Sequence, residues 1–94
     1  MSQDESRQEI ERRLKQLMTE KLRISPESLE RCDSHTPLLG RGLGLDSMEA
    51  MTLAVEIEEA FSMTIPDEDL TETLFTSLFS LSGYLVERRR QRGV

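Results

Sequence analysis

The stretch from Asp46 to Phe61 constrains the fold of this chain most, because its apolar residues recur at the spacing of an α-helix. At about 100° per residue, side chains that fall within one arc of about 120° form a stripe typical of a core-facing helix. That stripe consists of Ala50, Leu53, Ala54, Ile57, Ala60 and Phe61. Asp46 and Glu49 have the spacing of a capping box, which puts Ser47 in the first turn. We therefore predict a helix over residues 47–61 that buries one face.

The opposite face of this predicted helix is also apolar. Met51 and Val55 lie almost directly below Ser47, and Met48 lies beside them. Three carboxylates surround this strip, those of Glu56, Glu58 and Glu59. A single exposed apolar side chain is ordinary on a protein surface, whereas a contiguous apolar strip with a charged rim indicates a docking surface.

Ser47 stands in the first turn, where its hydroxyl is expected to face water. The backbone N–H groups of a first turn have no intrahelical partner and carry the positive end of the helix dipole, so they suit an anionic phosphate. Gly42 and Gly44 allow the chain to turn sharply into the helix. The same Asp-Ser-x-Glu pattern is also an ordinary helix cap, so the motif alone leaves both interpretations open.

Three further segments have helical patterns, and no segment alternates as a strand does. We predict helices over residues 4–22, with Ser6 and Glu9 as a capping box, over residues 67–71 after Pro66, and over residues 77–88, capped by Thr76 or Ser77. The expected fold is a single all-α domain over residues 1–94, a small four-helix up-and-down bundle with three longer helices and one short third helix.

The rest of the chain is expected to form loops. Pro26 ends the first helical pattern and begins a new turn, from which Leu29 reaches the core. The long segment from there to Leu45 is a loop by composition, attached to the bundle by Leu38, Leu39 and Leu43. Residues 88–94 form a basic tail, expected to be a solvated end, although it could also touch a partner or a phospholipid headgroup.

The charged residues are distributed unevenly along the chain. Ten Asp and Glu residues and no Lys or Arg lie between Gly42 and Glu87, while the basic residues lie in segments 7–41 and 88–92. An acidic half of this kind repels nucleic acid and anionic membranes and attracts basic protein surfaces. The same polarity can also serve solubility alone.

The remaining polar residues give little support for catalysis or metal binding. Cys32 is the only cysteine, which fits a reducing compartment, and a dyad with His35 rests on spacing alone. Asp67, Asp69 and Glu72 lack the spacing and central glycine of an EF-hand loop. No apolar run approaches the roughly 20 residues of a membrane span, and the N-terminus lacks the apolar core of a signal peptide. We expect a soluble cytoplasmic protein with no metal site and no active site of its own.

Three features then occur in a fixed order: the sequence Gly44-Leu45-Asp46-Ser47-Met48, the acidic helix behind it, and Ile65-Pro66-Asp67 after Phe61. In this order they resemble an acyl carrier protein over roughly Ser6 to Arg88. In that family the serine equivalent to Ser47 receives 4′-phosphopantetheine from coenzyme A, and the thiol of this arm carries an acyl chain as a thioester. The resemblance implies a non-catalytic carrier in a fatty acid, polyketide or related lipid or secondary-metabolite pathway.

The resemblance also implies roles for individual residues. Ser47 carries the arm, and the partner-recognition patch consists of Asp46, Met48, Met51, Val55, Glu56, Glu58 and Glu59. The acyl chain is sheltered between the second and last helices, where the pocket candidates are Leu53, Ile57, Phe61, Ile65, Phe75, Leu78 and Leu81, each of which also fits an ordinary filled core. The implied partners are a phosphopantetheinyl transferase of the holo-acyl-carrier-protein synthase type and acyl-transferring, condensing and acyl-activating enzymes. Neither nucleic acid nor membrane insertion is expected, and the protein is expected to be a monomer.

Some positions depart from the family pattern. Gly42 and Thr52 stand where acidic residues are common, and the stretch from Pro66 to the last helix is about two residues longer than in the fatty-acid members. These departures favour a dedicated pathway over housekeeping fatty acid synthesis. Two alternatives remain open: an aminoacyl or peptidyl carrier, whose second helix is usually less acidic, and an unmodified helical adaptor that binds a partner helix in its apolar groove.

Overall fold

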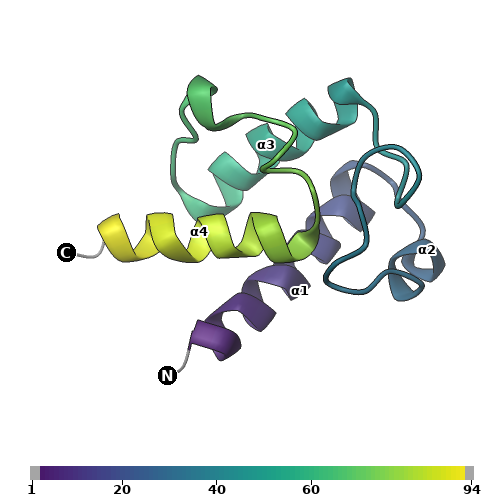
Figure 1. The fold of residues 1–94 in the computed structure, drawn as a ribbon, viewed down its shortest axis with the longest axis horizontal. Helices are drawn as coiled ribbons and strands as arrows, with labels where there is room; N and C mark the ends of the chain where they lie inside the picture. The colour runs from purple at the N-terminus through teal and green to yellow at the C-terminus, as the bar shows by residue number, and fades with distance from the viewer. Residues whose placement is uncertain (1–2, 93–94) are drawn as a thin grey trace.

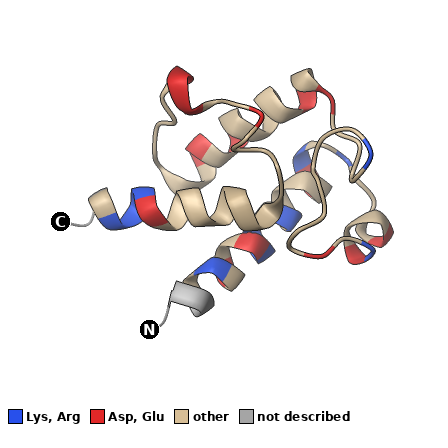
Figure 2. Cartoon of the chain, viewed as in Figure 1, with Lys and Arg blue, Asp and Glu red and all other residues tan. Residues whose placement is uncertain are grey.

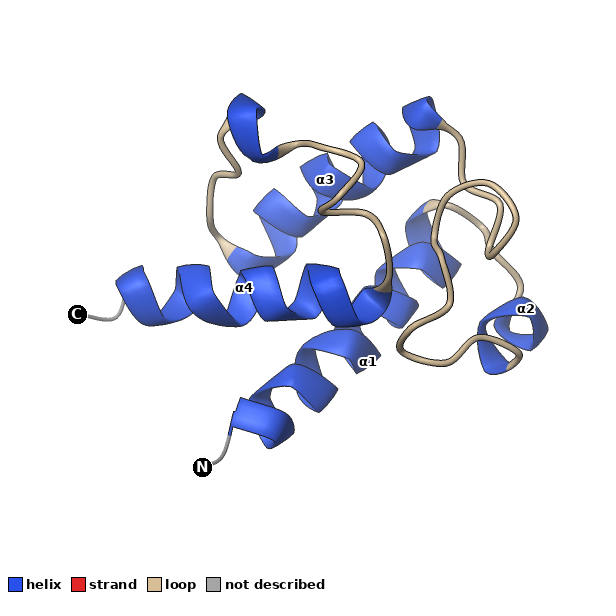
Figure 3. Ribbon diagram, viewed as in Figure 1, coloured by secondary structure: helices blue, strands red, loops and turns tan. Residues whose placement is uncertain are grey.

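Four α-helices and one 3₁₀ turn form the part of the chain that the computed structural model describes, which is residues 3–92 with side chains from residue 6 to residue 91 (Figures 1 and 3). The α-helices are α1 (Gln3–Lys21), α2 (Pro26–Glu30), α3 (Ser47–Phe61) and α4 (Leu78–Arg92), and the 3₁₀ turn η1 spans Asp67–Asp69. Within this range the only β-type pairings are two isolated bridges, Pro37 with Ser77 and Leu39 with Leu45. The predicted all-α helical bundle is therefore confirmed.

The helices begin where side chains satisfy the backbone N–H groups of the first turn. At α3, Asp46 Oδ1 accepts the Glu49 N–H at 2.8 Å and Glu49 Oε1 accepts the Asp46 N–H at 3.1 Å, so the predicted capping box is confirmed. At α4, Ser77 Oγ accepts the Ser80 N–H at 3.1 Å, which assigns the cap to Ser77. α3 ends at Ser62, whose backbone adopts the left-handed conformation with φ 51°.

The core is centred on α1, against which both α3 and α4 pack (Figure 1). Fully buried aliphatic side chains from the three long helices meet there: Ile10, Leu14, Met18, Leu53, Ile57, Leu78, Leu81 and Leu85. Leu29 of α2 and Leu38 and Leu45 of the long loop are buried against the same cluster, while Leu39 and Leu43 are partly buried. The predicted attachment of this loop to the bundle is therefore confirmed.

Several predicted boundaries need correction. The segment predicted as a helix over residues 67–71 is a 3₁₀ turn of three residues, and the short α-helix of the fold is instead α2, where a turn had been expected. Ser6 is not an N-cap, because α1 already begins at Gln3. Glu9 instead accepts a hydrogen bond from Arg12 Nη2 at 2.6 Å, and this bond lowers the pKa of Glu9.

The last helix also runs further than predicted, to Arg92 rather than residue 88, so most of the expected tail is helical. Arginine is a good helix former, and glycine follows only at residue 93, outside the described residues. Arg88 Nη2 donates to the Thr64 carbonyl oxygen at 3.2 Å, and Arg90 lies 3.7 Å from the Glu87 carboxylate. These interactions give the C-terminal turns local contacts that a solvated tail lacks.

Candidate functional site

Ser47 is the first residue of α3, and its side chain is exposed. The first intrahelical hydrogen bond runs from the Ala50 N–H to the Asp46 carbonyl oxygen at 2.9 Å, so the N–H groups of Ser47 and Met48 precede it. The sequence prediction of an accessible serine hydroxyl at a capped helix start therefore agrees with the structure.

The loop before α3 holds this helix start in place. The Leu45 N–H donates to the Leu38 carbonyl oxygen at 2.9 Å, and the Leu43 N–H donates to the Pro37 carbonyl oxygen at 2.8 Å. Gly42 lies so close to Pro37 that a Cβ atom on it would overlap the Pro37 carbonyl group. Gly44 has φ +89°, a conformation that residues with a side chain rarely adopt. Both glycines are thus required by the turn that delivers Asp46 and Ser47.

The outer face of α3 carries the predicted apolar strip. Met48 is 79% exposed, Met51 49% and Val55 50%, and with Ser47 and Thr52 they line a shallow groove of about 380 Å³. Thr52 was not among the predicted recognition residues, although its place beside Val55 on the helical wheel was a signal for it. The Thr52 hydroxyl donates to the Met48 carbonyl oxygen at 3.0 Å, which leaves its methyl group for the groove.

The three predicted carboxylates around this strip differ in their surroundings. Glu59 is exposed and Glu56 is half-buried. Glu58 is also half-buried, and its Oε2 accepts the Ile65 N–H at 2.7 Å. Glu58 therefore holds the chain that follows α3, a role that the helical wheel did not reveal. Figure 2 shows the wider pattern: α3 and η1 carry acidic and no basic residues, whereas α1 and the end of α4 carry residues of both signs.

A second hollow, of about 130 Å³, begins at Ser47 on the inner side of α3. Its walls come from α3, the long loop and the connection between α3 and α4: Leu39, Ala50, Met51, Leu70, Thr71, Glu72 and Phe75. Sequence reasoning named only Phe75 of these as a pocket residue. The others are brought together by long-range folding, for which the local pattern carries no signal.

The other pocket candidates lie deeper. Leu53, Ile57, Leu78 and Leu81 are at most 1% exposed and belong to the core shared with α1, while Ile65 is 3% exposed. Phe61 is half-buried, and the guanidinium carbon of Arg13 lies 4.1 Å from its ring centroid. These side chains form one continuous apolar region with the core, and Phe75 connects that region to the hollow at Ser47.

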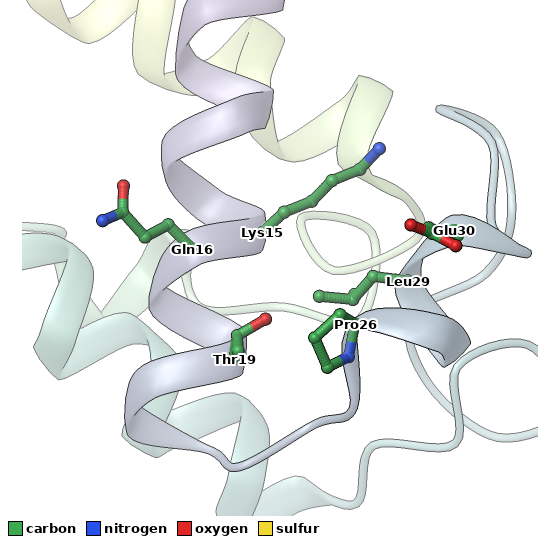
Figure 4. A pocket seen from close by; sticks show the side chains of 6 residues that line it. All are labelled: Lys15, Gln16, Thr19, Pro26, Leu29 and Glu30. Carbon is green, nitrogen blue, oxygen red and sulfur yellow. The ribbon is translucent and has the colours of Figure 1, made fainter.

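The remaining candidate sites are separate from Ser47. Cys32 Sγ donates to the Ser28 carbonyl oxygen at 3.3 Å, whereas the His35 ring stacks on Phe79 with centroids 4.6 Å apart, so each side chain has its own partner. No group of acidic, histidine and cysteine side chains in the described part of the chain is arranged to hold a metal ion. Another hollow, of about 220 Å³, lies between α1 and α2, and none of the predicted site residues lines it. Figure 4 shows its lining side chains, with Lys15, Gln16 and Thr19 from α1 and Pro26, Leu29 and Glu30 from α2.

Residues 12–85, which include the whole of this site, match the family model of the phosphopantetheine attachment site. The chain belongs to the acyl carrier protein family. It is 35% identical over 65 residues to an acyl carrier protein from Renibacterium salmoninarum, an alignment that covers 69% of this chain and 75% of the relative. No solved structure matches the chain.

Membership in the acyl carrier protein family establishes the general role. Such proteins are carriers without catalytic activity, and their covalently attached cofactor is 4′-phosphopantetheine. A phosphopantetheinyl transferase and acyl-handling enzymes act on members of the family. Among residues 3–92, none of the helices combines the length and apolar character needed to cross a membrane.

Proposed function

We propose that Ser47 carries the 4′-phosphopantetheine arm and that the protein presents acyl intermediates to biosynthetic enzymes. The observation that carries this proposal is an exposed hydroxyl on the first residue of a helix whose start is fixed by a complete capping box. When bound, the arm supplies a terminal thiol that holds the acyl group as a thioester. The protein's own residues position the arm and display a surface to the enzymes.

The residues around Ser47 fit a phosphate-linked arm. The N–H groups of Ser47 and Met48 lie at the positive end of α3, which favours an attached phosphate. The outer groove and the inner hollow both begin at Ser47. An arm attached there therefore has apolar surface on either side of its base.

The attachment step transfers a group from coenzyme A to the serine. A bond forms between Ser47 Oγ and the phosphorus of the pantetheine phosphate, the pyrophosphate bond of coenzyme A breaks, and adenosine 3′,5′-bisphosphate leaves. The hydroxyl proton passes to a base on the transferase. Asp46 fixes the start of α3 through its bond to the Glu49 N–H, and in this way it sets the position of the hydroxyl.

Partner enzymes are proposed to bind the outer face of α3. Met48, Met51, Val55 and Thr52 supply apolar contact, while Asp46, Glu56 and Glu59 attract and orient a basic enzyme surface. Glu58 adds its negative charge to this surface, but its side chain is held in place by the hydrogen bond from the Ile65 N–H. Contacts of this kind suit rapid exchange between a transferase and acyl-transferring, condensing or acyl-activating enzymes.

The pathway is proposed to be fatty acid, polyketide or related lipid or secondary-metabolite synthesis in the cytoplasm, with the carrier acting as a monomer. The acidic α3 favours acyl cargo over the aminoacyl or peptidyl cargo of the first alternative. The second alternative, an unmodified adaptor, conflicts with the cofactor of the family. The acyl chain is proposed to enter the apolar region between α3 and α4 that contains Leu53, Ile57, Phe61, Ile65, Phe75, Leu78 and Leu81.

The attachment site is tested by intact-mass measurement after incubation with coenzyme A and a broad-specificity phosphopantetheinyl transferase. The wild-type protein should gain the mass of one phosphopantetheine, and the Ser47→Ala variant should gain none. Helical content of the variant should stay unchanged, because an exposed first-turn position tolerates alanine.

Ser28→Ala provides the matched control, since Ser28 is an exposed serine in the first turn of α2. This variant should be modified as fully as the wild-type protein. A mass gain that persists in Ser47→Ala would assign the arm to another hydroxyl and overturn the proposal.

A further inference from the structure

The inner hollow beside Ser47 is small. A cavity of about 150 Å³ accommodates a benzene-sized molecule, so a hollow of about 130 Å³ has room for a chain of about four to six carbon atoms. Behind it the core is filled, since Leu53, Ile57, Leu78 and Leu81 are at most 1% exposed. An acyl chain longer than this therefore enters only if one wall of the hollow moves.

The walls of the hollow differ in how firmly they are held. Ala50 and Met51 belong to α3, and Leu39 is bridged to Leu45 in the long loop. The remaining wall is formed by Leu70, Thr71, Glu72 and Phe75. They belong to the connection of residues 62–77, which leaves the end of α3, rises to η1 and returns to the start of α4 (Figure 1). This connection contains no α-helix and no strand.

Only part of this connection packs into the core: Leu74 and Phe75 are buried, whereas Thr71, Glu72 and Thr73 are exposed. A hollow of about 270 Å³ is lined by the connection together with Ser80 and Tyr84 of α4, and another of about 340 Å³ is lined by the connection together with Pro37 and Leu39. Thr73 lines both of these hollows. A partly exposed segment without regular secondary structure opens at lower cost than the helical core, so the connection is the wall that yields first.

Two side chains of α4 bond to the part of the connection between Asp69 and Thr73, in addition to the bond of Arg88 to Thr64. The Tyr84 hydroxyl donates to Asp69 Oδ2 at 2.6 Å, and the Ser80 hydroxyl donates to the Thr73 carbonyl oxygen at 2.9 Å. Burial, followed by the hydrogen bond to Asp69, raises the pKa of Tyr84 to about 12. The phenol therefore keeps its proton at neutral pH and remains a donor.

We propose that the hydrogen bond from Tyr84 to Asp69 latches the connection in place and thereby selects short acyl groups, of about four to six carbon atoms, as the cargo that this carrier shelters. The inference rests on the proposed attachment of the arm at Ser47. Tyr84 acts through the position of the connection, so it is a positioning residue and touches neither the arm nor the reacting atoms.

The latch is tested by thermal melting of the carrier loaded with acyl groups of increasing length. The phosphopantetheinyl transferase loads Ser47 from butanoyl-, hexanoyl-, octanoyl- and decanoyl-coenzyme A, and intact mass verifies each product before melting. The melting temperature of the wild-type protein should rise up to the hexanoyl form, by roughly 3–6 °C at most for each methylene group that becomes buried, and then level off. In Tyr84→Phe it should continue to rise through the octanoyl and decanoyl forms.

Three further variants make the test specific to the latch. Asp69→Ala removes the acceptor and should behave like Tyr84→Phe, whereas Asp69→Asn keeps an acceptor oxygen and should behave like the wild-type protein. Ser34→Ala removes a hydrogen bond to Glu11 of similar length, 2.9 Å, on the α1 side of the molecule, and should lower every melting temperature without changing the dependence on chain length.

A wild-type melting temperature that keeps rising beyond the hexanoyl form would overturn the proposal. So would melting temperatures that level off at the hexanoyl form in Tyr84→Phe and Asp69→Ala, as they do in the wild-type protein. Failure of the proposed attachment is distinguishable, because it appears as the absence of a mass gain before any melt is recorded. Should Tyr84→Phe fail to fold, Asp69→Ala decides the outcome.

Discussion

The two faces of α3 both carry apolar side chains, yet only one of the faces is buried. On the inner face Leu53 and Ile57 are completely buried, while on the outer face Met51 and Val55 are half exposed. Apolar side chains therefore fill the core on one side of the helix and remain exposed on the other. The direction in which a side chain points from the helix axis, rather than its hydropathy, decides whether it is buried or exposed.

The largest expected effect tests the inner face. Leu53→Ala should lower the free energy of unfolding by about 2–5 kcal/mol, because it leaves a cavity in a filled core, and the melting temperature should fall by at least about 8 °C. Met51→Ala is the matched control, two residues away on the outer face of the helix. Equal losses in the two variants, measured by thermal melting, would show that the two faces do not differ as described.

An intermediate effect sharpens the comparison at the edge between the faces. Glu58→Ala should lower the free energy of unfolding by about 1–3 kcal/mol, because the half-buried Ile65 N–H loses its acceptor. Glu59→Ala, at the neighbouring exposed position, should leave stability nearly unchanged. It should instead slow loading by the transferase at low salt, with the difference shrinking as salt rises.

Denaturant unfolding and loading kinetics at several salt concentrations measure these two effects separately. A Glu59→Ala protein that loads at the wild-type rate at low salt would show that this carboxylate only solvates the surface. An unchanged stability of Glu58→Ala would show that its bond to Ile65 contributes nothing.

The smallest effect on stability is expected on the outer strip. Met51→Ala and Val55→Ala should each change the free energy of unfolding by no more than about 0.5 kcal/mol, as is usual for surface positions. The same changes should lower kcat/KM for transfer from a partner enzyme several-fold, since a buried interface contact is lost. Transfer at the wild-type rate in both variants would move the docking surface elsewhere.

Local signals made the start of the site predictable from the sequence. The capping box of Asp46 and Glu49 fixes the first residue of α3, and the apolar stripe fixes which face is buried, so both agree with the structure. The cap at Ser6 was wrong because a helix can begin upstream of a matching pattern. The end of α4 was missed because nothing in a run of arginines stops a helix.

Contacts between residues far apart in the sequence could not be predicted from the spacing of apolar residues. The bond between Glu58 and Ile65 depends on the left-handed turn at Ser62, which reverses the chain after α3. The walls of the inner hollow come partly from Leu39 and partly from Leu70 and Glu72, two segments that stand far apart in the sequence. These residues come together only when the long loop and the connection fold over α3. A helical wheel of α3 includes neither segment.

Gly42 carries a consequence for how this protein can change over time. Its position has no room for a Cβ atom while the Pro37 carbonyl group stays where it is, so any single substitution forces two pieces of backbone apart. An acidic residue of the kind common there in related carriers would require the chain at Pro37 to shift as well. Because the obstacle is a backbone carbonyl group, which every residue type at position 37 would carry, the approach to Ser47 resists substitution at Gly42 for as long as the loop keeps this conformation.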